Sequence, residues 1–107
     1  MDDRELLEMA AKAAGEDVEW HDSGSYFYRK SCNWPAEKGF FNPLHDDGEA
    51  LRLAVELRFD IAINLYVVDV FSGELDDFIR ERCRDGDAAN ATRRAIVRAA
   101  AAIGRAM

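Results

Sequence analysis

The sequence has little of what marks secreted or membrane-spanning proteins. Cys32 and Cys83 are its only cysteines, too few for a disulfide framework, and we expect both to be reduced thiols. No apolar run approaches the roughly 20 residues that a membrane helix needs. The acidic start of the chain also differs from a secretory signal. The sequence therefore predicts a cytoplasmic protein that does not associate with a membrane.

Motifs of common catalytic and nucleotide-binding sites are also missing. There is no G-x-S-x-G elbow, Walker loop, G-x-G-x-x-G turn or H-E-x-x-H pattern. Structural zinc sites draw on closely spaced ligand pairs, and the four residues with suitable atoms are scattered: His21, Cys32, His45 and Cys83. The same residues allow a Cys–His nucleophile pair, which nothing in their spacing singles out. We expect a non-enzymatic protein with no metal and no cofactor.

What the sequence does contain is typical of one ordered globular domain. The chain has 107 residues, 49% of them hydrophobic and 33% charged, with a formal net charge of −7. Residues 88–107 hold four arginines and no acid, a charge of +4, which leaves −11 on residues 1–87. Such an acidic body argues against broad nucleic-acid binding, because attraction to phosphates dominates that affinity. A local basic patch stays compatible with it.

The middle of the chain carries the strongest local signals. Pro43 cannot lie inside a helix, and Asp46 follows it as an N-cap with Glu49 at the third helical position, a capping box. An apolar stripe follows and predicts docking on a sheet, and Leu51 and Val55 widen it. The members of the stripe are Ala50, Leu53, Ala54 and Leu57.

Two further helices are indicated near the ends of the chain. Asp2 caps the first, with Glu5 in another capping box, and Gly15 stops it. Asp87 begins the last, whose final turn Gly104 weakens, so that we expect the tail to fray. Its predicted buried seam consists of Ile96, Ala100, Ile103 and Met107. The three helices are expected over residues 2–14, over residues 46–58, and from residue 87 almost to residue 107.

Short segments between the helices predict antiparallel strands. Residues 18–21 and 26–29 flank a turn-forming cluster and predict a hairpin. Residues 59–63 and 66–71 favour strands through their Ile, Val and aromatic content. Residues 78–84 fit a strand or a short helix, and we favour the strand. The order helix–hairpin–helix–strands–helix predicts a single α+β domain with a small, mostly antiparallel sheet.

Parts of this pattern resemble a known family. Residues 5–15 fit it, and the two main motifs are Phe-Asn-Pro-Leu-His-Asp-Asp-Gly-Glu-Ala-Leu-Arg-Leu-Ala at 41–54 and Ala-Thr-Arg-Arg-Ala-Ile-Val-Arg-Ala-Ala at 91–100. Together they cover about a third of the chain and look like the phage ABA sandwich domain family of small bacteriophage and prophage proteins. The resemblance implies a three-layer α/β/α sandwich and a phage- or prophage-encoded protein in a bacterial host cell. It assigns no reaction and no catalytic residue.

Aromatic side chains are concentrated between residues 20 and 41. Seven of the eleven aromatics of the chain lie there: Trp20, Tyr26, Phe27, Tyr28, Trp34, Phe40 and Phe41. Such rings usually cap the core of a small domain. The alternative is an exposed surface that binds a partner protein, for which the candidate residues are Trp34, Phe40 and Phe41.

Arginines provide a second candidate surface. If residues 78–84 form a strand, then Arg80, Arg82 and Arg84 line one face at alternate positions, a spacing suited to phosphates or to an acidic partner. The last helix extends this face with Arg93, Arg94 and Arg98. The alternative is that the arginines pair with nearby acids such as Glu81, because charge runs on small domains usually form solvated faces.

The main hypothesis is a phage or prophage accessory protein that acts by protein–protein contact. The alternative is a small nucleic-acid-binding regulator that uses the arginines, and a hydrolase with an unrecognised site has weaker support. A hard-metal site at His45, Asp46, Asp47 and Glu49 is disfavoured. The ligand spacing of a calcium loop is missing there, and helix capping already accounts for Asp46 and Glu49.

Overall fold

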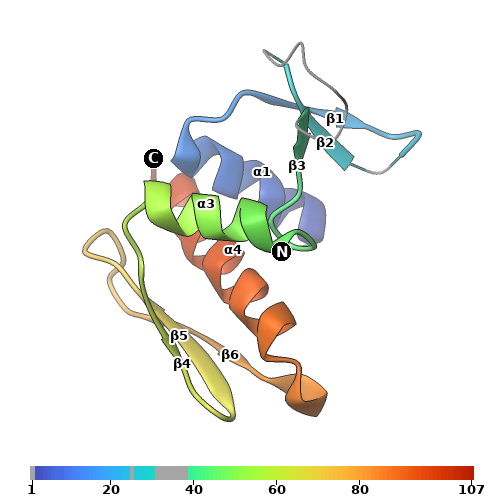
Figure 1. Cartoon of the computed structure of the whole chain (residues 1–107). Helices are drawn as coiled ribbons and strands as arrows, with labels where there is room; N and C mark the ends of the chain where they lie inside the picture. The colour runs from blue at the N-terminus through green and yellow to red at the C-terminus, as the bar shows by residue number, and fades with distance from the viewer. Residues whose placement is uncertain (1, 25, 31–38) are drawn as a thin grey trace.

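The computed structural model describes residues 2–24, 26–30 and 39–107. In these ranges the chain forms an α+β fold of three helices and two three-stranded sheets, and Figure 1 shows the helices between the sheets. The helices are α1 (Asp3–Ala14), α3 (Asp47–Glu56) and α4 (Ala88–Ala106). Sheet A contains β1 (Val18–His21), β2 (Tyr26–Arg29) and β3 (Phe40–Phe41). Sheet B contains β4 (Asp60–Ile63), β5 (Val67–Phe71) and β6 (Ile79–Arg82).

The predicted helix starts are confirmed by the caps. A carboxylate oxygen of Asp2, Asp46 or Asp87 accepts a hydrogen bond from the backbone N–H three residues later, at 2.9, 2.9 and 3.0 Å. Each bond satisfies a donor that the first turn leaves without an intrahelical partner. Gly15 follows α1 with a φ of 72°, the left-handed conformation expected of a stop residue. α3 ends at Glu56, close to the expected position.

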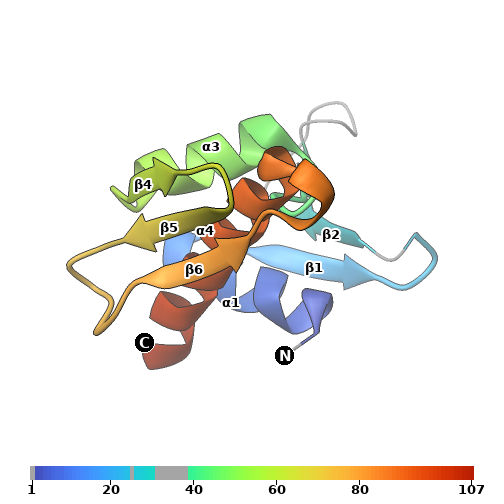
Figure 2. The same cartoon turned by 90° about the horizontal axis from the view of Figure 1, so that it is seen from below.

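The strands are antiparallel, as predicted, but they lie in two sheets rather than in the single small sheet that was expected. The hairpin of β1 and β2 has the predicted bounds. β3 has only two residues and leads through a turn directly into α3, so the chain enters the helical layer before β4 begins. β4, β5 and β6 therefore pair among themselves (Figure 2).

Helix α4 is the centre of the fold. It packs against α1, α3, β5 and β6. The predicted seam of Ile96, Ala100 and Ile103 is buried, whereas Met107 is 67% exposed, so its assignment to the seam was wrong. The helix ends at Ala106, so Met107 lies outside it.

The apolar stripe of α3 is narrower than predicted. Ala50, Leu53 and Ala54 are buried, whereas Leu51 is 61% exposed and Val55 is also exposed. α3 packs against α4 and makes no comparable contact with either sheet within the described residues. Two large apolar side chains are therefore left at the surface.

Candidate functional site

The predicted arginine face is only partly formed. Residues 79–82 form the favoured strand, and Arg80 and Arg82 alternate with half-buried residues along it. Arg84 lies in a 3₁₀ turn, η1 (Arg84–Gly86), so it does not continue the alternation, and its assignment to the strand was wrong. The strand ends because the chain turns there into the start of α4.

Arg80 is neutralised by an acid on the neighbouring strand. Its Nε lies 2.7 Å and its Nη2 2.9 Å from the two carboxylate oxygens of Asp69, which is buried on the outer face of sheet B. This hydrogen bonding lowers the pKa of Asp69 and raises that of Arg80, so both groups stay ionised at neutral pH. Arg82 and Arg84, by contrast, are exposed and form no ion pair within the described residues.

The arginines of α4 do not extend the outer face of β6. Arg93 turns towards α3, where it donates to a carboxylate oxygen of Asp47 at 2.6 Å and to the carbonyl oxygen of Leu44 at 3.0 Å. Arg94 and Arg98 approach Glu81, which points from β6 towards the helices, opposite to the neighbouring Arg80. The predicted extension was wrong because a strand turns successive side chains to opposite faces.

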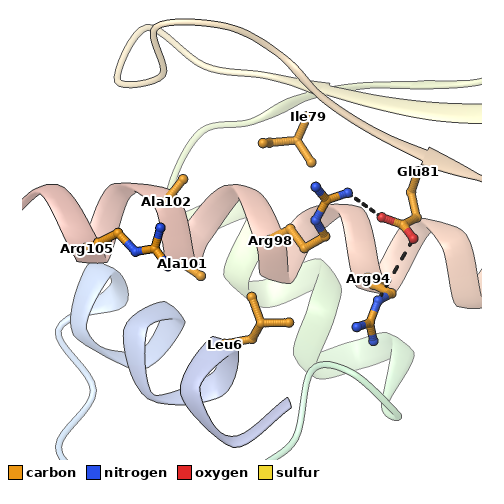
Figure 3. A pocket seen from close by; sticks show the side chains of 8 residues that line it. All are labelled: Leu6, Ile79, Glu81, Arg94, Arg98, Ala101, Ala102 and Arg105. Carbon is orange, nitrogen blue, oxygen red and sulfur yellow. Dashed lines mark hydrogen bonds and ion pairs between the residues drawn. The ribbon is translucent and has the colours of Figure 1, made fainter. Parts of the chain in front are cut away.

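A cavity of about 520 Å³ lies where these arginines meet β6. Figure 3 shows it between α1, α4 and β6, with Glu81 between Arg94 and Arg98. We call it the arginine cavity. Its lining residues are Leu6, Ile79, Glu81, Arg94, Arg98, Ala101, Ala102 and Arg105.

The aromatic candidates separate into core and surface. Phe41 is 3% exposed and pairs across the strands with buried Phe27, so its assignment to a binding surface was wrong. Phe40 is half-buried on the outer face of sheet A, where its ring centroid lies 4.8 Å from that of Tyr26. Trp34 lies outside the described residues. The alternation of β3 explains the separation, since adjacent residues face opposite sides.

A buried ion-pair network went unnoticed in the sequence. Arg29, at the end of β2, contacts Glu49 of α3 with both of its terminal nitrogens and Glu16 with its Nε. Glu49 was assigned to a capping box, and its backbone N–H does bind Asp46, but the carboxylate turns to Arg29. Arg29 shares a strand face with buried Phe27, and that alternation was the signal that could have revealed it.

A second hollow, about 370 Å³ in volume, lies between α3, β4 and α4. Leu51 and Ile63 stand at its exposed positions, at 61% and 60% exposure. We call it the apolar groove. Its lining residues are Asp47, Ala50, Leu51, Ile61, Ile63, Ala89, Thr92, Arg93 and Ile96.

β4 lies beside this groove at the edge of sheet B. Within the described part of the chain it pairs with β5 alone, and Figure 2 shows it on the side of the sheet nearest α3. Ile61 and Ile63 lie opposite buried Val70 and Val68, so they face the helices. The groove therefore combines apolar side chains with one unpaired strand edge.

The residues considered for metal binding or catalysis lie on different elements. His45 contacts Asn42 at 3.1 Å, His21 stacks on Tyr26, and Cys83 is a half-buried free thiol after β6. Cys32 is outside the described residues. In the described ranges, no three His, Cys, Asp or Glu side chains gather as a metal site would require. None of the helices described is both long enough and apolar enough to cross a membrane.

Comparisons with protein-family models, with curated proteins and with solved structures gave no match to this chain. The resemblance of residues 41–54 and 91–100 to the phage ABA sandwich domain family therefore stays a prediction. The arginine cavity, the apolar groove and the exposed arginines Arg82 and Arg84 are the surfaces on which a function can be proposed.

Proposed function

We propose that this chain is a non-enzymatic accessory protein of phage or prophage origin that binds another protein. The partner adds an extended apolar segment with basic flanks to the edge of β4, over the apolar groove. The observation that carries this proposal is the pair of exposed side chains, Leu51 and Ile63, beside an unpaired strand edge. The phage setting rests on the resemblance alone. The proposal of a non-enzymatic role rests on the lack of common catalytic motifs in the sequence.

An extended segment suits the groove better than other shapes. A strand added to β4 forms main-chain hydrogen bonds with the open edge, and its alternate side chains fall on the helix side of the sheet, as Ile61 and Ile63 do. Those side chains then cover Leu51. Large exposed apolar residues next to an unpaired edge are otherwise an aggregation hazard, which a bound partner removes.

The charge around the groove favours a basic partner. Residues 46–63 contain five carboxylates and two arginines, but Asp47 pairs with Arg93 and Glu49 with Arg29. The segment keeps a net charge of −1, in a chain whose formal charge is −7. A second copy of the chain would bring two such surfaces together, and like charges across an interface are unfavourable. A segment with lysines or arginines beside its apolar residues complements this surface instead.

The test is site-directed photo-crosslinking followed by direct binding. A photoreactive amino acid at position 51 is exposed to a bacterial host lysate, with the same group at position 102, on the other side of α4, as the control. The protein captured only from position 51 is then purified, and its binding segment is mapped with overlapping peptides. We expect a short extended segment with alternating apolar residues and basic flanks.

Binding of that segment should depend on the groove. Ile63→Asp and Leu51→Glu are each expected to weaken it by at least about tenfold, since a charge replaces an apolar anchor. Phe78→Ser, on the outer face of sheet B, is the control and should change the affinity by less than about twofold. Crosslinking only to a second copy, or an acidic binding segment, would contradict the proposal.

Nucleic-acid binding is the second candidate, and one observation favours it. Arg82 and Arg84 are exposed without an acidic partner in the described ranges, and with Arg94 they line a hollow of about 280 Å³. Binding of single-stranded DNA or RNA should then weaken steeply with salt and with Arg82→Ala. Arg80→Ala is the matched control, because Asp69 already neutralises that guanidinium. Absence of binding at low salt would exclude this candidate.

A further inference from the structure

The arginine cavity lies on the opposite side of α4 from the apolar groove. Arg94, Arg98 and Arg105 face the cavity, whereas Arg93 and Ile96 line the groove. At about 100° per residue along a helix, the two sets point in opposite directions. A ligand in the cavity therefore leaves a strand bound at the groove undisturbed, and the two sites can be tested separately.

We propose that the arginine cavity binds the phosphate group of a nucleotide-sized ligand. Its lining contains three arginines and one acid, Glu81, in a chain whose formal charge is −7. A phosphate monoester presents three acceptor oxygens, whereas a carboxylate presents two. The guanidinium donors that line the cavity therefore suit a phosphate better than a carboxylate.

The guanidinium of Arg98 is held in place while part of it stays available. Its Nη1 donates to a carboxylate oxygen of Glu81 at 2.6 Å and to the carbonyl oxygen of Arg80 at 3.0 Å. Its Nε and Nη2 donate to no group among the described residues. Glu81, whose side chain is 16% exposed, thus positions donors that do not have to be ordered when an anion arrives.

Arg94 is held in a similar way at the other side of Glu81. Its Nη1 donates to an exposed carboxylate of Asp3 at 3.2 Å, and its Nε lies 3.9 Å from Glu81, too far for a hydrogen bond. Figure 3 shows Arg94 and Arg98 on either side of Glu81. Two guanidinium groups, one held by Glu81 and the other by Asp3, form a frame for an anion with several oxygens.

The size and the walls of the cavity indicate more than a bare phosphate. Its volume of about 520 Å³ falls within the range of small-molecule sites. Leu6 and Ile79 face each other across it, and Ala101 forms an apolar part of the helix side (Figure 3). These apolar walls suit the body of a phosphate ester, such as the sugar and base of a nucleotide, and arginine planes also stack on bases.

Titration calorimetry with four probes tests this proposal. The probes are AMP, inorganic phosphate, acetate and a short 5′-phosphorylated single-stranded oligonucleotide. We expect AMP to bind more tightly than phosphate or acetate. Arg98→Gln should weaken AMP by about tenfold or more, since charged hydrogen bonds to the phosphate are lost. Arg52→Gln, an exposed arginine on α3, is the control and should leave the affinity within about twofold.

A second variant guards against misfolding. Circular dichroism reports whether Arg98→Gln folds, and Arg105→Gln, at the exposed end of α4, removes a cavity arginine without touching Glu81. Equal affinity for acetate and AMP, or for phosphate and AMP, would overturn the proposal, as would no binding of either ester at about 5 mM. Tighter binding of the oligonucleotide that is weakened by Arg98→Gln but not by Arg82→Ala supports it with a strand end as the source, and equal binding of oligonucleotide and AMP supports it with a free nucleotide. Tighter binding of the oligonucleotide that only Arg82→Ala weakens would overturn it.

Discussion

Arg29 and Glu49 form a two-pronged ion pair between sheet A and helix α3, with Nη1–Oε1 at 2.8 Å and Nη2–Oε2 at 3.1 Å. The same guanidinium donates to Glu16 at 3.0 Å and to the carbonyl oxygen of Phe40 at 2.8 Å. Hydrogen bonding to Glu49 raises the pKa of Arg29 against the opposing effect of burial, and Glu16 adds to the rise. One permanently charged side chain thus joins α3 to the end of α1 and to sheet A.

The first prediction is that Arg29→Met destabilises the fold strongly. The side chains of Arg29 and Glu49 are only 11% and 15% exposed, so removing the cation leaves an uncompensated carboxylate. Breaking such a pair costs about 3 kcal/mol in free energy of unfolding, measured by urea denaturation. The double variant Arg29→Met with Glu49→Leu should lose less free energy of unfolding than Arg29→Met alone, because it leaves no unpaired carboxylate at position 49.

The neighbouring pair provides the control for this prediction. Lys30 contacts Asp17 at 3.5 Å, and both side chains are more than half exposed. Lys30→Met should therefore cost less than about 0.5 kcal/mol. A loss in the double variant as large as in Arg29→Met would contradict the interpretation that the stranded carboxylate causes the instability.

The second prediction concerns the acid dependence of stability. The hydrogen bond from Arg80 holds the pKa of Asp69 below its ordinary value of 3.8. As the pH falls through that value, the unfolded chain takes up a proton at Asp69 while the folded chain does not. The free energy of unfolding therefore decreases with falling pH, until the folded carboxylate is protonated as well.

Asp69→Asn removes this contribution. We expect the variant to be less stable than the wild type at neutral pH and to lose less stability between about pH 5 and pH 2. Urea denaturation at a series of pH values measures both effects. Asp60→Asn is the matched control, because Asp60 is exposed on the same outer face and has no ion pair within the described residues. Parallel curves for the wild type and Asp69→Asn would exclude this contribution.

Local signals were the part of this fold that the sequence revealed. Asp2, Asp46 and Asp87 cap their helices because an N-cap needs only a side-chain oxygen three residues before a backbone N–H. The hairpin of β1 and β2 was recognisable for the same reason, since its turn and both strands are contiguous. None of these features depends on a partner far along the chain.

Contacts between distant segments were the part that could not be predicted. Glu49 lies 20 residues from Arg29, and no local pattern indicates that their side chains meet. Leu51 belongs to an apolar stripe in the sequence, but its exposure depends on how α3 is placed relative to β4 and α4. The apolar groove and the arginine cavity both depend on such placements, so the sequence named Arg94 and Arg98 but neither the cavity that they line nor the groove.

The third prediction concerns the contact between α1 and α4. Gly104 was expected to weaken the end of the last helix, yet α4 continues to Ala106. A Cβ at Gly104 would clash with the carbonyl oxygen of Met9 and would lie 3.3 Å from the backbone nitrogen of Ala13. The missing side chain therefore lets the two helices pack closely.

Gly104→Ala is accordingly expected to destabilise the fold. Alanine gains about 1 kcal/mol in helix propensity, but overpacking against a backbone costs about 1–3 kcal/mol, because backbone cannot move aside as a side chain can. We expect a net loss of about 1 kcal/mol, measured by thermal or urea unfolding. Gly73→Ala is the control, because a Cβ at Gly73 meets nothing within 4 Å. Its free energy of unfolding should stay within about 0.5 kcal/mol of the wild-type value. An increase in stability for Gly104→Ala would show that the helices can separate at no cost.

The fourth prediction uses the two helix ends that share one geometry. After α1, the backbone N–H of Glu16 donates to the carbonyl oxygen of Ala11 at 2.9 Å, and Gly15 adopts the left-handed conformation. After α3, Phe59 N–H donates to the carbonyl oxygen of Ala54 at 3.0 Å, but the left-handed position is held by Arg58, with a φ of 60°. A side chain in this conformation is strained, whereas glycine is not.

Arg58→Gly should therefore raise the free energy of unfolding by about 0.5–1 kcal/mol, despite the loss of a charged surface residue. Gly15→Ala is the reverse experiment and should lower it by a similar amount, since a Cβ there meets no atom within 4 Å and only the backbone conformation opposes it. Urea denaturation of both variants measures the pair of effects. The same sign of change in the two variants would refute a shared left-handed cap, because relieving the strain in one helix end and introducing it in the other must act in opposite directions.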